Sequence, residues 1–147
     1  GLVRDTLELL LKYSRKINGD GQIIHELLPN GVCPNKGNVQ ETPQFITAVR
    51  QCYQWTPDRS LVVEAYDCCE KAAQWLQRMD DDRDGFPTGY GLIEINGLNM
   101  EMIDCAVYTC QAYDSFASLS GLMGKNEASE SYRRLAGWLR EKINQEF

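Results

Sequence analysis

The chain has 147 residues, of which 43% are hydrophobic and 24% are charged. This length and balance are typical of one ordinary globular domain and exclude a disordered or fibrous chain. The net charge is −6, and an acidic surface repels phosphate backbones and anionic headgroups, so we expect neither nucleic acid nor membrane as a partner. No apolar run approaches the roughly 18 residues that span a bilayer.

Six cysteines and a single histidine limit the metal chemistry of the chain. The cysteines form no C-x-x-C pair, and no Cys/His set has the spacing of a zinc site, so we expect neither a structural metal nor a cofactor. Five of the six fall within helix-like apolar patterns, where a thiol serves as a small core residue. We therefore expect reduced thiols, which favours a cytoplasmic location.

Apolar residues at helical spacing predict a first helix over residues 2–17. The sequence Asn-Gly-Asp-Gly at 18–21 supplies a strong stop signal. Residues 22–41 contain prolines and glycines without a sustained period, which predicts a loop of unusual length for a compact domain. Loops of this kind commonly carry function.

Thr42-Pro43 and Thr56-Pro57 each predict a helix start. In both pairs a hydroxyl is available as the N-cap, and proline follows at the first helical position, where its missing N–H costs nothing. The two helices that follow carry apolar faces wide enough to pack against a core.

A second long loop, rich in aspartate and glycine, is predicted over residues 80–97. Beyond it, helical spacing begins at Met102 and stops near Gly121 or Gly124, and Asn126 is placed to cap a last helix. Five helices joined alternately by short and long connections predict an all-α domain of helical hairpins. We expect the long loops to gather on one face, where a site would form.

The sequence Asp-Asp-Asp-Arg-Asp-Gly at 80–85 matches the opening of a calcium loop. The match is incomplete, because position twelve is Gly91 instead of the glutamate that closes such a loop. We favour an Asp-rich turn whose side chains bond local backbone amides, with a bound cation as the alternative.

The glycine-rich stretch 85–104 combines aromatic rings with carboxylates and suits a sugar ring. Aromatic faces pack on a pyranose, and a carboxylic acid with a raised pKa can protonate a glycosidic oxygen. The structural alternative is equally weighted: Glu94 is then a solvated loop residue and Glu101 a charge favoured at a helix start. For Glu41 the alternative is the same helix-start role, and His25 is more commonly a satisfied loop residue than a general base.

The motifs follow one another in an order that resembles a known family. They are Gly-Gln-Ile-Ile-His-Glu at 21–26, Glu-Thr-Pro-Gln-Phe at 41–45, Trp-Thr-Pro-Asp at 55–58, Asp-Arg-Asp-Gly-Phe-Pro-Thr-Gly-Tyr-Gly-Leu-Ile-Glu at 82–94, and Asp104 with Ala-Val-Tyr-Thr at 106–109. Taken together they resemble the six-hairpin glycosidases, and most closely the bacterial glycogen-debranching, amylo-α-1,6-glucosidase-like branch. The resemblance spans nearly the whole chain, and the joint order is far more specific than any single motif.

The resemblance implies an (α/α)6 toroid, in which helical hairpins form two concentric rings around an inverting α-glycosidase site. Five helices are less than half of such a barrel, so we expect residues 1–147 to be a single domain, a partial toroid and a fragment of a longer catalytic domain. The first residue is Gly instead of Met and no signal segment precedes Leu2, which fits a processed or excised product.

The resemblance also implies α-linked glucose oligosaccharides as substrates, hydrolysed with the help of a carboxylic general acid. In the trehalase-like branch that acid is an Asp at the position of Asn99, and an amide cannot act as a general acid. The debranching-like branch points instead to Asp104, with Glu101 one helical turn before it on a shared face, and Glu94 ranks third. The expected substrate contacts are His25, Glu26, Glu41, Tyr90 and Asn99.

The second carboxylate of an inverting pair has no candidate in this chain, so the fragment alone need not be active. The alternative function is a non-catalytic helical-hairpin module that binds carbohydrate or protein. An open ring leaves apolar helix faces exposed, and such faces would support a homo-oligomer.

Overall fold

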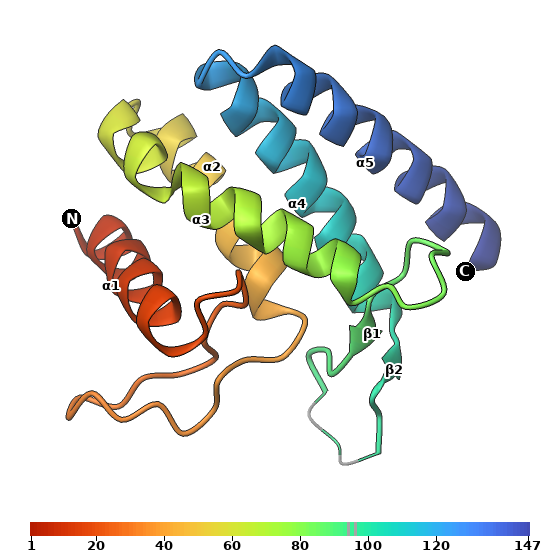
Figure 1. The fold of residues 1–147 in the computed structure, drawn as a ribbon, viewed down its shortest axis with the longest axis horizontal. Helices are drawn as coiled ribbons and strands as arrows, with labels where there is room; N and C mark the ends of the chain where they lie inside the picture. Colours follow the sequence, from red (N-terminus) through yellow and green to blue (C-terminus); the bar gives the residue numbers. More distant parts are fainter. Residues whose placement is uncertain (94, 96) are drawn as a thin grey trace.

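The computed structural model describes residues 1–93, 95 and 97–147, and within these ranges the chain is α-helical apart from one short strand pair (Figure 1). The helices are α1 (Leu2–Ile17), α2 (Glu41–Trp55), α3 (Arg59–Arg78), α4 (Ile103–Leu122) and α5 (Asn126–Glu146). Strands β1 (Thr88–Gly89) and β2 (Met100–Glu101) pair antiparallel, with Thr88 opposite Glu101. The predicted all-α fold class is confirmed.

The helices pack around one core, to which each of them contributes. Helices α4 and α5 form an antiparallel hairpin, and α2 packs against both α3 and α4 (Figure 1). Phe116 of α4 is fully buried at the centre, with its ring 5.4 Å from that of Tyr66 in α3 and 4.8 Å from that of Tyr132 in α5. Ser129 of α5 ties the hairpin further by donating a 2.7 Å hydrogen bond to the carbonyl of Ala117.

Three predicted helix caps are wrong, those at Thr42, Thr56 and Asn126. Helix α2 begins at Glu41, one residue before Thr42, and the Thr42 hydroxyl is fully buried and accepts a 3.1 Å hydrogen bond from the Ile23 amide. The long loop competes for this hydroxyl because it packs directly on the start of α2. Helix α5 begins at Asn126 itself, and the residue in the cap position, Lys125, makes no side-chain cap bond.

In the link between α2 and α3, the Thr56 hydroxyl caps the end of α2 instead of the start of α3. Thr56 closes α2 by donating a 2.9 Å hydrogen bond to the carbonyl of Cys52. The cap of α3 is Asp58, whose carboxylate accepts from the Ser60 amide at 2.8 Å. Aspartate in this position satisfies an unpaired first-turn N–H and also complements the helix dipole.

The six cysteines are free thiols, and four of them, Cys68, Cys69, Cys105 and Cys110, are buried core residues. Burial raises the pKa of the Cys68 thiol to about 11, and burial together with the nearby Asp104 and Glu41 carboxylates raises that of Cys105 to about 12. Among the described residues, none of the helices combines the length and the apolar character that a membrane crossing requires.

Candidate functional site

The two long loops meet at one end of the helices, at the lower edge of the view in Figure 1. The amide of Val39 in the first loop donates a 3.1 Å hydrogen bond to the carbonyl of Tyr90 in the second. Gly89 makes this approach possible, because a Cβ at that position would lie 2.0 Å from a methyl carbon of Val39. The loops are therefore packed together, as expected from their alternation with short links.

A hollow of about 120 Å³ lies where the loops meet the C-terminal end of α3, and we call it the loop hollow. Two of the predicted substrate contacts, Tyr90 and Asn99, line it. The sequence did not single out Gln22, Asn38 or Trp75, which line it as well. Gln22 lies within the motif at 21–26, and Asn38 lies three residues before the motif at 41–45. This proximity was the signal in the sequence that could have identified them.

Asp104 in the first turn of α4 shapes the second loop beside Tyr90. Its Oδ2 accepts a 2.6 Å hydrogen bond from the Leu92 amide, while Oδ1 is buried without a hydrogen-bond partner among the described residues. Gly91 lies against the same carboxylate, and a Cβ there would be 2.4 Å from Oδ2 and 2.7 Å from Oδ1. Asp104 thus fixes the backbone at residues 91 and 92.

Glu101, the other leading candidate for the acid, lies in β2 and precedes α4. The expected helix face shared with Asp104 is therefore absent, because pairing with Thr88 keeps the backbone extended up to residue 101. The Glu101 side chain is exposed. Its pKa is nonetheless raised, first by partial desolvation and then by the Asp84, Asp82 and Asp80 carboxylates.

The Asp-rich segment forms the turn that the sequence favoured. Asp80 accepts hydrogen bonds from the amides of Asp84 at 3.0 Å and Gly85 at 2.9 Å, and Asp84 accepts from Phe86 at 2.8 Å. Carboxylate oxygens of Asp80, Asp82 and Asp84 lie within 4.8 Å of one another, and burial raises the pKa of Asp80. Such clusters are common without an ion, so we assign no metal to them.

Helix α5 holds this turn in place. The φ of Gly85 is +100°, and a Cβ there would lie 2.5 Å from the ring of Trp138. The Lys142 ammonium stands 5.5 Å from the centre of the Phe86 ring, which also meets Phe147 edge-on at 5.8 Å. The Asp turn and the neighbouring Glu101 therefore lie next to α5.

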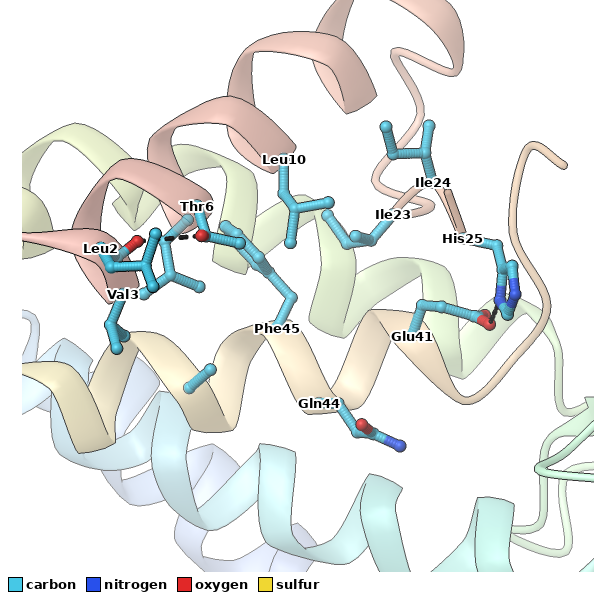
Figure 2. Close-up of a pocket in the computed structure, with 12 residues that line it drawn as sticks. Leu2, Val3, Thr6, Leu10, Ile23, Ile24, His25, Glu41, Gln44 and Phe45 are labelled. Carbon is cyan, nitrogen blue, oxygen red and sulfur yellow. Dashed lines mark hydrogen bonds and ion pairs between the residues drawn. The ribbon is translucent and has the colours of Figure 1, made fainter. Parts of the chain in front are cut away.

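His25 of the first long loop and Glu41 at the start of α2 come together, as Figure 2 shows. The Nδ1 atom of the imidazole bonds Glu41 Oε1, and Glu41 Oε2 accepts a 2.7 Å hydrogen bond from the Asn38 amide. Glu41 thus contacts Asn38, which lines the loop hollow. It contacts two points of the first long loop in addition to starting α2, which the sequence alone did not indicate.

An apolar groove of about 460 Å³ runs between α1 and α2 and ends at the His25–Glu41 pair (Figure 2). Leu10 of α1 and Phe45 of α2 are typical of its lining. Glu41 is the one carboxylate among the described residues that line this α1–α2 groove.

The predicted site residues are thus divided among separate places. Tyr90 and Asn99 line the loop hollow, and Asp104 contacts the backbone at Gly91 and Leu92, next to Tyr90. The other described candidates lie elsewhere: His25 and Glu41 at the end of the α1–α2 groove, Glu26 exposed in the first loop, and Glu101 beside the Asp turn. Glu94 lies outside the described residues.

The loop face therefore offers amides, aromatic rings and carboxylates held on glycine-rich backbone. Neither the protein-family models nor the curated protein sequences contain a match to this chain. A functional conclusion rests on the residues and on their geometry.

Proposed function

We propose that this chain is part of a six-hairpin glycoside hydrolase that acts on α-linked glucose oligosaccharides. The observation that carries the proposal is the contact between the two long loops at Val39 and Tyr90. This contact brings the motifs at 21–26 and 41–45 and the described part of the third motif, residues 82–93, to one end of the helical domain, where the resemblance requires a site.

The carboxylates Glu101 and Asp104, near the second long loop, support an inverting mechanism in which this chain supplies the acid. Such an acid must hold its proton near neutral pH, and the pKa of Glu101 is shifted in that direction by partial desolvation and by the neighbouring carboxylates. Asp104 Oδ2 is engaged with the Leu92 amide and Oδ1 is buried, so neither oxygen is presented to a glycosidic bond. We therefore place Glu101 before Asp104 as the acid. The carboxylate that activates water comes from another part of the protein.

Hydrolysis by the protein that contains this chain tests the proposal. Maltotriose and isomaltose are supplied separately, and the anomer of the released glucose is followed by proton NMR, since inversion of an α-linkage gives the β-anomer first. Glu101→Gln should lower kcat at least about a hundredfold, the scale of a lost general acid, with a small change in KM. Glu127→Gln, an equivalent change at an exposed position on α5, should leave kcat unchanged.

Two results would contradict the assignment. Undiminished turnover in both Glu101→Gln and Asp104→Asn would show that neither carboxylate donates the proton. Release of the α-anomer first would refute inversion and would require two closely spaced carboxylates instead.

One observation favours the alternative of a non-catalytic carbohydrate-binding module. The described residues that line the loop hollow include no carboxylate, and a sugar bound there would meet amides and rings without an acid. Under this alternative the intact protein binds oligosaccharides and releases no glucose from them. The hydrolysis assay therefore separates the two functions directly.

The partial toroid remains a proposal as well, and the α1–α2 groove supports it. Leu2, Val3 and Trp55 are 83%, 63% and 86% exposed, and all three line this groove or the hollow that adjoins it. In a toroid, a neighbouring hairpin would cover such a face. In the isolated chain the same face would favour a homo-oligomer, which sedimentation equilibrium can detect.

A further inference from the structure

We infer that the loop hollow binds a single neutral, hydroxyl-rich ring, that is, one sugar residue, using Gln22, Asn38, Tyr90 and Asn99. This inference rests on the proposed function and identifies where one ring of its substrate lies. The residues come from both long loops, so the site exists only when the loops are joined.

The side chains of the hollow match the hydrogen-bonding properties of sugar hydroxyls. A hydroxyl both donates and accepts, and so do the amides of Gln22, Asn38 and Asn99 and the phenol of Tyr90. The described lining residues include no charged side chain, so an ionic ligand would lose its hydration without gaining a counter-charge. The ligand class is therefore neutral and polar.

The hollow also offers an apolar wall and a defined size. Met79 and the ring of Trp75, which is 7% exposed, contribute apolar surface against which the C–H face of a pyranose can pack. A volume of about 120 Å³ corresponds to about four water molecules at roughly 30 Å³ each. That is enough for one ring set partly into the hollow, which is open to solvent.

The hollow is rigid before any ligand enters. Gln22 Nε2 donates a 2.8 Å hydrogen bond to the Gly37 carbonyl, which fixes one wall. The bond between Val39 and Tyr90 joins two further lining residues across the two loops. A preformed site loses little conformational freedom on binding, so even a single ring can bind measurably, with a Kd on the order of millimolar.

The test is a titration of the 15N-labelled 147-residue chain with methyl α-D-glucopyranoside, followed through its side-chain amide and indole signals. We expect saturable shifts at Gln22, Asn38, Asn99 and Trp75. Cyclohexanol, a ring of the same size with one hydroxyl, should bind at least about tenfold more weakly, since its polar contacts are missing. Asn99→Ala, at an exposed position, should weaken binding at least about fivefold.

Matched controls keep the result interpretable. Gln51→Ala removes an exposed amide from the hollow beside the α1–α2 groove and should leave the Kd unchanged. A Tyr90→Phe variant keeps the ring and removes the hydroxyl, so it should weaken binding without unfolding the chain. An unchanged pattern of backbone amide signals confirms that each variant is folded.

Three outcomes would overturn the inference: no saturable shift at the hollow up to about 100 mM sugar, equal binding of cyclohexanol, or shifts confined to the α1–α2 groove. These outcomes differ from failure of the proposed function. Hydrolysis without shifts at the hollow would refute the ring site alone. Shifts at the hollow without hydrolysis by the intact protein would refute the hydrolase and leave the ring site.

Discussion

Replacement of Gly91 by alanine should destabilise the fold, and the structure gives the size of the effect. An added Cβ would lie 2.4, 2.7 and 2.9 Å from the Oδ2, Oδ1 and Cγ atoms of Asp104. Gly91 does not have a positive φ, so the cost is steric and not a backbone penalty. The Asp104 side chain must move and lose its bond to Leu92, which places the loss at about 2–4 kcal/mol from overpacking and a broken hydrogen bond.

Thermal unfolding measured by circular dichroism can test this value. At roughly 2–4 °C per kcal/mol for a chain of this size, Gly91→Ala should lower Tm by about 5–15 °C. Gly137→Ala is the control, because this glycine lies inside α5 with no atom within 4 Å of the added Cβ, and it should stabilise by about 0.5–1 kcal/mol.

A double-mutant cycle then isolates the contact itself. Asp104→Ala removes the carboxylate that the new methyl group would strike, so Gly91→Ala should cost little in that background. An equal cost of Gly91→Ala with and without Asp104, or no cost at all in the parent chain, would refute the role assigned to this contact.

Two further predictions concern titratable groups. The raised pKa values of Asp80 and Glu101 mean that folding favours their protonated forms, so the stability that they contribute is present below their unfolded pKa values and is lost as pH rises through the folded ones. Glu101→Gln should therefore raise Tm relative to the parent at pH 7 and leave it unchanged near pH 3, and a gain of equal size at both pH values would contradict the linkage. Native labelling by a thiol reagent at pH 8, read by mass spectrometry, should modify the half-buried Cys33 and Cys52 first. Thiols of the core, whose pKa values are raised by burial, should react only on unfolding: Cys68, Cys69, Cys105 and Cys110.

The helices were predictable because their apolar spacing is local and repeated over many residues. The first helix was predicted over residues 2–17 and is observed at Leu2–Ile17. The caps at Thr42, Thr56 and Asn126 were not, because a hydroxyl or amide at a helix start can bond whichever group lies nearest in space. Thr42 shows this most clearly, since its partner is the amide of Ile23 in a distant loop.

The candidate site was predictable only in part. Tyr90 and Asn99 were expected as substrate contacts on the strength of the resemblance, and both line the loop hollow, while their role stays a prediction. Gln22 lies inside the motif at 21–26 but was not named as a candidate, and Trp75 gave no signal, because a tryptophan in a helix has many ordinary uses. Their shared location follows from the packing of the first loop against the end of α3.

The sequence by itself determined the all-α class, the two long loops and the residue types that suit a sugar. These properties depend on neighbours in the chain and on periodicity, which the sequence displays directly. The tertiary structure decided which residues meet: Val39 with Tyr90, Glu41 with His25, and Asp104 with the turn at Gly91. Each of these contacts joins segments that are separated along the chain, and only the packing of the helices fixes the distance between them.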